Sequence, residues 1–338
     1  MTRALLIAAG GGIGDVLLAT PVARALAGRY DAVDGVTARA HRVVMERSGA
    51  FDAVFDDAPL RELVPLLAAR HYDAAVVTWA TSHTALLPLV ARIPVRVGQA
   101  RRIYSRAFTD RVTVRSERGD RLTHWTQILL DYARAIGCDV ADPTPRFLVR
   151  DDDRAAARAI VAARAGGGVY AVLHPTRGIA GRRERWPIAG FVSLVRAIRE
   201  RYGIESFISG SVEDAGIADA IASQSGAISV AGAASLATFA ALAERASIVV
   251  AMDSGPMHLA AAVGAPTVGV FALASDEPDR WAPLGPRTTS VRNTYPCPPS
   301  HRKETCPDFA CIRDLDTAQI LEQIDRVRAV PAQSEQRS

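Results

Sequence analysis

The chain has little lysine and cysteine, and it has no long uninterrupted apolar run. Lys303 is its single lysine, so nearly all of its 40 basic residues are arginines. Four cysteines in 338 residues are too few for a disulfide scaffold. Every apolar stretch of about 18 residues is broken by charge, proline or glycine, so we expect no membrane span. No basic run is interleaved with aromatics, which argues against nucleic-acid binding.

The overall composition is that of an ordinary globular protein, with 49% hydrophobic and 22% charged residues. The length suggests two domains, each large enough for its own core. The apolar start, residues 4–9, could be mistaken for a signal peptide. A glycine-rich turn and a helix follow it at the spacing of a strand–turn–helix unit, so we expect a cytoplasmic protein. The net charge of +4 fits either a solvated basic surface or attraction to anionic lipid or phosphorylated glycan.

Short apolar runs alternate with stretches of helical periodicity along the chain. The first half predicts strands at 4–9 and 74–78, helices at 15–27 and 122–136, and a linker at 141–145. The second half predicts strands at 170–174, 206–209, 247–252 and 267–271, with helices at 151–164, 188–202, 213–223, 236–244, 257–263 and 317–327. This alternation indicates an α/β protein with two doubly wound, Rossmann-like domains, whose ligands sit at the carboxyl ends of parallel strands.

The first turn after a predicted strand contains Gly10, Gly12 and Gly14, followed by Asp15. It resembles a dinucleotide fingerprint, but the position of the last glycine in that motif is occupied by Asp15. A carboxylate there would repel a pyrophosphate at the helix N-terminus. Asp15 is therefore either an acidic residue that stabilises the first helical turn or a general base that takes a proton from a bound hydroxyl.

A second turn, Asp253–His258, joins the predicted strand 247–252 to a helix. Ser254 or Gly255 suits the N-cap and Pro256 suits the first helical turn, so the backbone amides there could bind an anion. An ordinary well-capped turn is the alternative interpretation. Asp253 suits sugar or ribose hydroxyls, and His258 is either a diphosphate contact or a structural histidine.

Two further loops follow predicted strands of the second half. His174 and Thr176 lead into an arginine-rich segment with Arg177, Arg183 and Arg185, whose guanidinium groups could bind phosphate or simply be solvated. After the strand at 206–209, Glu213 could accept ribose hydroxyls or cap the next helix.

The sequence resembles glycosyltransferase family 9, the ADP-heptose:lipopolysaccharide heptosyltransferases, over residues 3–328. The resemblance is carried by the glycine–aspartate turn that ends in Asp15, the arginine–glycine segment Arg92–Gly98, Thr123–Trp125, and the turn Met252–His258 with the four residues after it. One departure stands out. The family usually carries a lysine two residues before its tryptophan–proline pair, and here that position is Glu184, flanked by Arg183 and Arg185, either of which could replace the lysine.

The resemblance implies a GT-B architecture, with an acceptor domain at 1–150 and a nucleotide-sugar domain at 151–315 that face a central cleft. It also implies that a helix at 316–330 returns to the first domain, and residues 331–338 are expected to form a disordered tail. The implied activity is an inverting, metal-independent transfer of heptose from ADP-heptose to a lipid-linked lipopolysaccharide inner-core acceptor, at the cytoplasmic face of the inner membrane. No cofactor beyond the donor is implied.

The residues expected at this site fall into three groups. Asp15 would be the catalytic base. The acceptor would contact Gly12, Gly14, Arg96 and Arg101. The donor would contact His174, Thr176, Arg177, Arg183, Arg185, Glu213, Asp253, Ser254, Gly255, Pro256 and His258.

Several alternatives remain open. Another nucleotide sugar or another surface-glycan acceptor would keep the fold, and Glu184 favours this. A non-catalytic nucleotide-sugar binder would bind the donor without turnover and tolerate loss of Asp15. Cys297, Cys306, Cys311 and His301 could ligate zinc, but they contain no CxxC pair, so we expect free thiols and no metal.

Overall fold

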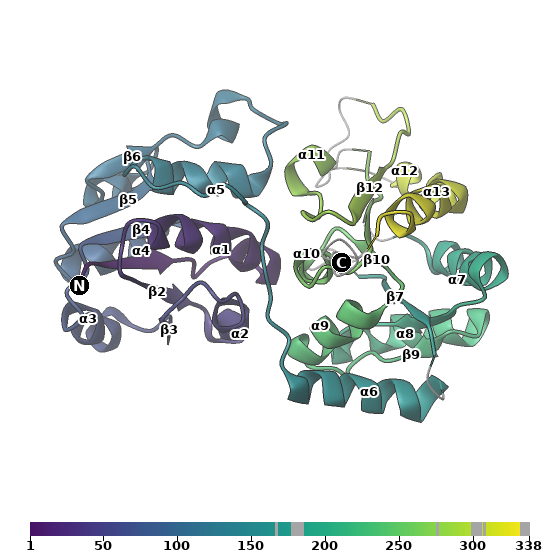
Figure 1. Cartoon of the computed structure of the whole chain (residues 1–338). Coiled ribbons are helices and arrows are strands. Elements are labelled where there is room, and N and C mark those ends of the chain that lie inside the picture. The colour runs from purple at the N-terminus through teal and green to yellow at the C-terminus, as the bar shows by residue number, and fades with distance from the viewer. Residues whose placement is uncertain (166–167, 177–185, 275–276, 299–305, 307–308, 332–338) are drawn as a thin grey trace. The chain divides into compact units, whose positions relative to one another are not determined.

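The computed structural model describes residues 1–165, 168–176, 186–274, 277–298, 306 and 309–331. The chain divides into two compact units, Met1–Leu148 and Val149–Ser338, which we call the N-terminal and C-terminal units (Figure 1). No helix in the described part of the chain is both long and apolar enough to cross a bilayer.

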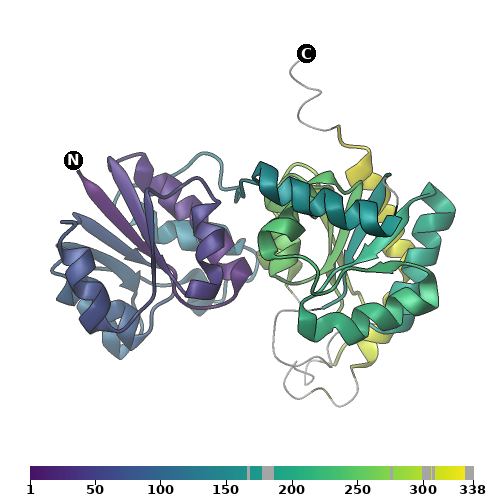
Figure 2. The ribbon, with the colours of Figure 1, turned by 90° about the horizontal axis from the view of Figure 1, so that it is seen from below.

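The N-terminal unit is built on one parallel sheet with strand order β3-β2-β1-β4-β5-β6. Helices cover both of its faces, as Figure 2 shows. Its elements are β1 (Arg3–Ile7), α1 (Ile13–Ala27), β2 (Ala32–Thr37), η1 (Arg39–His41), α2 (Arg42–Glu46), β3 (Ala53–Asp56), α3 (Leu60–Ala68), β4 (Ala74–Val77), α4 (Ser82–Val90), β5 (Val95–Gln99), η2 (Ile103–Ala107), β6 (Asp110–Val112), η3 (Arg115–Arg118) and α5 (Trp125–Arg134).

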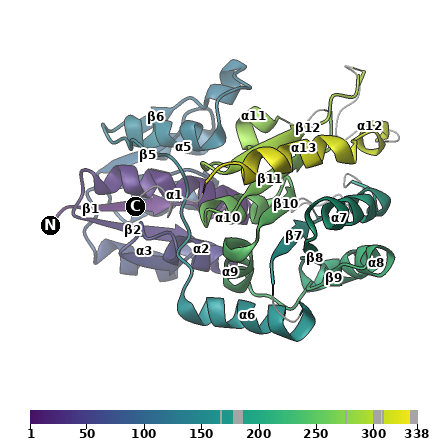
Figure 3. The same cartoon turned by 45° about the vertical axis from the view of Figure 1, so that its right-hand side comes forward.

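The C-terminal unit repeats the same plan with strand order β12-β11-β10-β7-β8-β9. In Figure 3, α7, α8 and α13 lie on one side of these strands and α6, α9 and α10 on the other. Its elements are α6 (Asp151–Ala165), β7 (Tyr170–His174), α7 (Ile188–Tyr202), β8 (Glu205–Ile208), η5 (Val212–Asp214), α8 (Ala215–Ser225), β9 (Ile228–Ser229), α9 (Leu236–Arg245), β10 (Ile248–Met252), α10 (Gly255–Ala262), β11 (Thr267–Phe271), α11 (Pro278–Trp281), β12 (Thr288–Arg292), α12 (Ala310–Arg313) and α13 (Thr317–Arg328).

Both sheets follow the order of a doubly wound fold, so the predicted fold class is confirmed. In each sheet the first strand of the unit lies in the centre and is paired on both sides, β1 between β2 and β4, and β7 between β8 and β10. The order reverses between β1 and β4 and again between β7 and β10. Ligands of such sheets bind at these two points, beyond the carboxyl ends of the strands.

The last helix, α13, packs on β11, β12 and α7 of its own unit. The expected return of residues 316–330 to the N-terminal domain stays a prediction. Ile320, Ile324 and Val327 belong to the core of the C-terminal unit. Helical periodicity predicts this apolar face but does not reveal which surface covers it.

One buried carboxylate explains why the sequence pattern did not reveal β2. Asp34 lies within this strand and is fully buried, so the strand does not read as a continuous apolar run. Its carboxylate accepts hydrogen bonds from the Tyr72 hydroxyl at 2.6 Å and from the Arg70 guanidinium at 3.0 Å. Arg3 lies 3.7 Å from the same oxygen. The network ties β2 to the chain before β4 and to β1.

We predict that Asp34→Ala lowers the stability of the N-terminal unit by about 2–3 kcal/mol, because it leaves two arginines and a buried hydroxyl without their acceptor. Tyr72→Phe removes a single hydrogen bond and should cost only about 1 kcal/mol. Guanidinium-induced unfolding of the two variants measures both effects. Equal losses would mean that the arginines contribute nothing through Asp34.

Candidate functional site

The turn between β1 and α1 holds Asp15 by steric and hydrogen-bond constraints. Gly11 has a φ of +75°, and a Cβ there would meet the Asp15 carboxylate at 2.5 Å. A Cβ at Gly10 would lie 1.8 Å from the indole of Trp79. The Asp15 carboxylate accepts the Gly12 N–H at 2.8 Å and so closes the first turn of α1. Because positions 10 and 11 are glycines, the Asp15 carboxylate and the Trp79 indole can both pack against this short turn.

Asp15 is half-buried, and burial raises its pKa above the ordinary carboxyl value. The Gly12 N–H and the nearby His41 act in the opposite direction, because both favour the charged carboxylate. The contact with the Gly12 N–H confirms the first-turn interpretation of Asp15, and the general-base interpretation stays a prediction with which the raised pKa is compatible. Asp15 stabilises the start of α1, and its raised pKa makes it a better proton acceptor than a solvated aspartate.

His41, on η1, is a residue that the sequence pattern did not single out. It is half-buried, and burial lowers its pKa, while Asp15 favours its charged form. Its Nδ1 is buried and has no hydrogen-bond partner within the described ranges. A lone histidine after a strand carries no signal in the sequence, because only the fold brings it near Asp15.

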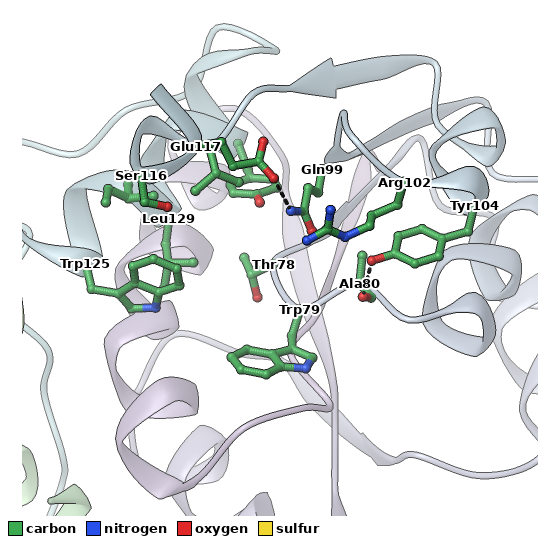
Figure 4. Close-up of a pocket in the computed structure, with 13 residues that line it drawn as sticks. Thr78, Trp79, Ala80, Gln99, Arg102, Tyr104, Ser116, Glu117, Trp125 and Leu129 are labelled. Atoms are coloured by element: carbon green, nitrogen blue, oxygen red, sulfur yellow. Dashed lines mark hydrogen bonds between the residues drawn. The ribbon is translucent and has the colours of Figure 1, made fainter. Parts of the chain in front are cut away.

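A pocket of about 350 Å³ opens beyond the carboxyl ends of β4 and β5 (Figure 4). Its lining combines aromatic rings with polar groups from three connections: Thr78, Trp79, Ala80, Gln99, Arg102, Tyr104, Val114, Ser116, Glu117, Trp125, Ile128, Leu129 and Tyr132. Since β4 is the neighbour of β1, the pocket lies beside the Asp15 turn in the strand order. Sequence reasoning overlooked Trp79, although it follows a predicted strand directly.

Of the residues expected to contact an acceptor, Gly12 and Gly14 lie at the start of α1, beside Asp15. Arg101 is exposed next to the pocket, and its guanidinium donates to the Glu117 carbonyl at 3.4 Å. Arg96 does not lie there. Its guanidinium donates to the carbonyls of Ala107, Ile93 and Pro94, and its residue pairs with Ala75 near the other end of β4. Arg96 therefore braces the β5–β6 connection, and its contact with an acceptor stays a prediction.

In the C-terminal unit, His174 ends β7 and is paired in register with Ala251 of β10, so Asp253 follows at the same edge of the sheet. The His174 Nδ1 lies 3.1 Å from the Ser209 hydroxyl, and its Nε2 lies 3.2 Å from the Thr176 hydroxyl. Burial lowers the pKa of His174 to about 4. The imidazole is therefore neutral near pH 7, and it ties the loop after β7 to the loop after β8. Ser209 was not among the predicted residues.

The turn before α10 has the predicted N-cap and first helical residues. Ser254 is the N-cap residue, and its hydroxyl donates to the Met252 carbonyl at 2.8 Å instead of capping the helix. Gly255 and Pro256 form the first turn, where the helix dipole and backbone amides favour an anion. Asp253 is half-buried and His258 is buried in the same turn. The N-cap and first turn are formed as predicted, while contact of this turn with a diphosphate and of Asp253 with hydroxyl groups stays a prediction.

Of the other residues expected to contact the donor, Glu213 lies in the described part of the chain and the arginines do not. Glu213 is exposed on η5, and capping at Ser211 is done by its neighbour Asp214, whose carboxylate accepts the backbone N–H and the hydroxyl of Ser211. Glu213 lies in the first turn of η5, and both interpretations of it, as a hydroxyl acceptor or as a helix-capping residue, stay open. Arg177, Arg183, Glu184 and Arg185 lie outside the described residues.

The cysteines are all free thiols. Cys306 accepts the Phe309 N–H at 3.3 Å, and Cys311 is buried in the C-terminal core. His301, the fourth member of the suggested zinc set, lies outside the described residues. Within the ranges that are described, no group of three or more histidine, cysteine, aspartate or glutamate side chains is placed to hold a metal ion.

Comparison with known proteins identifies one family and a set of similar folds. The model of glycosyltransferase family 9 (heptosyltransferase) matches residues 60–308. The ADP-heptose lps heptosyltransferase II of E. coli is 19% identical, with a TM-score of 0.78 over 97% of this chain and 98% of that chain. A glycosyl transferase family 9 protein from Veillonella parvula DSM 2008 is 17% identical, with a TM-score of 0.82 over 97% of each chain. The E. coli heptosyltransferase WaaC with ADP is 18% identical, with a TM-score of 0.72 over 96% of this chain and 100% of that chain. None of the curated proteins matches the chain.

The neutral state of His174 predicts a pH dependence of stability. Its pKa is about 4 in the folded protein and about 6.5 in the unfolded chain, so the unfolded chain binds the proton more readily. The contribution of neutral His174 to the free energy of unfolding is complete above about pH 6.5. It falls by about 3 kcal/mol as the pH drops toward 4. Urea unfolding at pH 7 and pH 4.5 should show this loss in the parent protein and a flatter profile in His174→Gln. Substitution of the exposed His71 by glutamine should leave the profile unchanged, and parallel profiles for His174→Gln would refute the assignment.

Proposed function

Because this chain belongs to glycosyltransferase family 9, we propose that it transfers heptose from ADP-heptose to a lipopolysaccharide inner-core acceptor with inversion at the anomeric carbon. Its family is the heptosyltransferase family, and its fold is the GT-B fold of the solved heptosyltransferases. The donor sugar, the acceptor and the stereochemistry are the parts that we propose.

The observation that carries the proposal is the position of Asp15. Its half-buried carboxylate, with a raised pKa, ends the glycine turn where the strand order of the N-terminal sheet reverses. In the proposed reaction, Asp15 takes the proton of an acceptor hydroxyl as the hydroxyl oxygen attacks the anomeric carbon. A new carbon–oxygen bond forms, the bond to the diphosphate oxygen breaks, and its electron pair leaves with ADP. A single displacement of this kind inverts the configuration.

The donor side of the proposal lies in the C-terminal unit. The dipole and amides at the start of α10 would stabilise the diphosphate, with Arg177, Arg183 or Arg185 adding positive charge. His174 stays neutral and holds the two loops beside the turn. Asp253 and Glu213 would accept hydroxyl groups of the sugar or ribose. These groups supply the charge stabilisation that a metal ion provides elsewhere, so we propose metal-independent transfer.

The acceptor side fits a lipid-linked glycan. Arg101 is exposed beside the pocket of the N-terminal unit, and arginines near an anionic bilayer favour peripheral contact with it. We therefore propose that the protein works in the cytoplasm, with peripheral contact at the cytoplasmic face of the inner membrane.

Glu184 favours a second candidate, in which the fold and base are retained but another nucleotide sugar or another surface glycan is used. It occupies the position at which the family usually carries a lysine. Arginine binds phosphate through a planar fork and lysine through a point charge, so a replacement by Arg183 or Arg185 changes the geometry of donor binding.

We predict that Asp15→Asn lowers heptosyl transfer by about 10²–10⁴-fold, because asparagine keeps the acceptor of the Gly12 N–H but cannot take a proton. Turnover of ADP-heptose with heptose-deficient core, followed by mass spectrometry, measures the loss. ADP binding should persist in the variant. Asp219→Asn, which changes an exposed aspartate on α8, is the matched control and should be fully active. Undiminished transfer by Asp15→Asn would exclude Asp15 as the base.

A panel of ADP-, GDP-, UDP- and dTDP-sugars in EDTA tests the donor and the metal together. ADP and ADP-heptose at about 100 times their dissociation constant should raise the thermal midpoint by several degrees, since binding then adds about 2.7 kcal/mol. The other nucleotides should not stabilise the protein. Stabilisation by a non-adenine donor alone would favour the second candidate, and a requirement for divalent metal would contradict metal independence.

A further inference from the structure

The outer face of α4 is apolar and exposed. This helix contains no aspartate, glutamate, lysine or arginine. Ala85 and Leu87 are buried in the core beneath it, whereas Leu86, Leu89 and Val90 are 39%, 41% and 49% exposed. The last three residues share one face of the helix, because they are three and four positions apart. A surface helix normally has polar residues on the side away from the core, so this face is suited to contact with an apolar partner.

The same kind of surface continues onto the neighbours of α4. The helix packs against both α3 and η2, where Leu66 is 56% exposed and Ile103 is 91% exposed. The Tyr104 hydroxyl on η2 donates to the Ala80 carbonyl at 2.7 Å, as Figure 4 shows, and so holds η2 beside the start of α4. Large exposed apolar residues on adjacent elements mark an interaction surface. We call the following residues the apolar surface: Leu66, Leu86, Leu89, Val90 and Ile103.

Unpaired arginines accompany the apolar surface. Arg92 follows the end of α4, Arg106 lies on η2, and both are exposed. Neither guanidinium has a hydrogen bond or an ion pair within the described ranges. Arg102 is also exposed, so that Ile103 has an exposed arginine directly before it and another three positions after it. An apolar side chain between arginines suits an interface that is apolar inside and anionic at its edge.

The acidic residues between β3 and α3 do not neutralise these arginines, because each has a basic partner of its own. Asp56 lies 3.3 Å from Arg42, and Asp57 lies 2.9 Å from the His83 Nε2.

Glu62, on α3, lies 3.4 Å from Arg61. The charge that remains unpaired beside the apolar surface is therefore positive.

We propose that the apolar surface, together with Arg92 and Arg106, binds the surface of an anionic lipid bilayer. The leucines, Val90 and Ile103 enter the boundary between headgroups and acyl chains, and the arginines bind lipid phosphates. A second copy of the chain is the less suitable partner. In a two-fold interface the same patch meets itself, which brings like charges together.

This surface deepens the proposed peripheral contact by naming the residues that make it, and it rests on the proposed function for its purpose. Ala80 precedes α4 directly, Tyr104 lies on η2, and both line the pocket of the N-terminal unit. Contact of α4 and η2 with a bilayer would therefore hold this unit next to a lipid-linked acceptor. Binding to the bilayer does not itself require a donor or turnover.

The test is co-sedimentation of the full chain with lipid vesicles. One set of vesicles contains phosphatidylcholine alone, and the other contains about a third phosphatidylglycerol, which supplies an anionic surface. We expect the partition coefficient to be about 10-fold higher on the anionic vesicles, because each arginine near an anionic surface adds to the binding. High salt should reduce this difference, because it screens the charges.

Two double variants assign the binding to this surface. Leu86→Ser with Leu89→Ser should lower the partition coefficient on anionic vesicles about 10-fold, because two apolar side chains no longer enter the bilayer. Arg92→Gln with Arg106→Gln should reduce binding on anionic vesicles to the level seen on neutral ones.

The matched control is Val169→Ser with Arg158→Gln, which changes an exposed valine and an exposed arginine of the C-terminal unit and should bind as the parent protein does. Unchanged far-ultraviolet circular dichroism shows that each variant is folded.

Full binding by both double variants, or no binding of the parent protein to anionic vesicles, would overturn the proposal. So would a dimer in sedimentation velocity that Leu86→Ser with Leu89→Ser dissociates, because a second copy would then cover the surface. If the vesicles are bound as expected but the protein transfers no heptose, the lipid surface stands and the proposed function fails.

Discussion

The parallel pairing of one central strand with a neighbour on each side is the constraint on which both candidate sites depend. In each unit the chain runs from the first strand to one side and later returns to the other, so the connections diverge beyond β1 and β7. The Asp15 turn lies at the first of these points, and His174 and Asp253 lie at the second. The same topology therefore creates two candidate sites with different chemistry.

The difference in chemistry comes from which groups stay charged. In the N-terminal unit burial raises the pKa of the Asp15 carboxylate, and this carboxylate accepts one backbone N–H. In the C-terminal unit burial keeps His174 neutral, and the start of α10 contributes positive potential at this edge. The proposed proton acceptor and the proposed anion site thus lie on separate sheets. This division suits a reaction in which one substrate loses a proton and the other releases a diphosphate.

Arginine shows how strongly tertiary contacts decide the role of a residue in this lysine-poor chain. Arg96 donates to three backbone carbonyls and stabilises the β5–β6 connection. Arg102, only six positions later, is exposed beside a pocket and has no carboxylate partner among the described residues. Both belong to one basic stretch of sequence. Their difference arises because Arg96 lies toward the amino end of β5 and Arg102 follows its carboxyl end.

The sequence by itself determined the alternation of strands and helices, the Asp15 and Asp253–His258 turns and the family, because these depend on local periodicity, glycine, capping residues and short motifs. β7 and α7 have the predicted bounds, 170–174 and 188–202. Only the tertiary structure decided the packing of α13, the structural role of Arg96, the proximity of His41 to Asp15 and the pocket between Trp79 and Glu117. Each of these depends on contacts between residues far apart in the chain, and local pattern does not encode which buried surfaces meet.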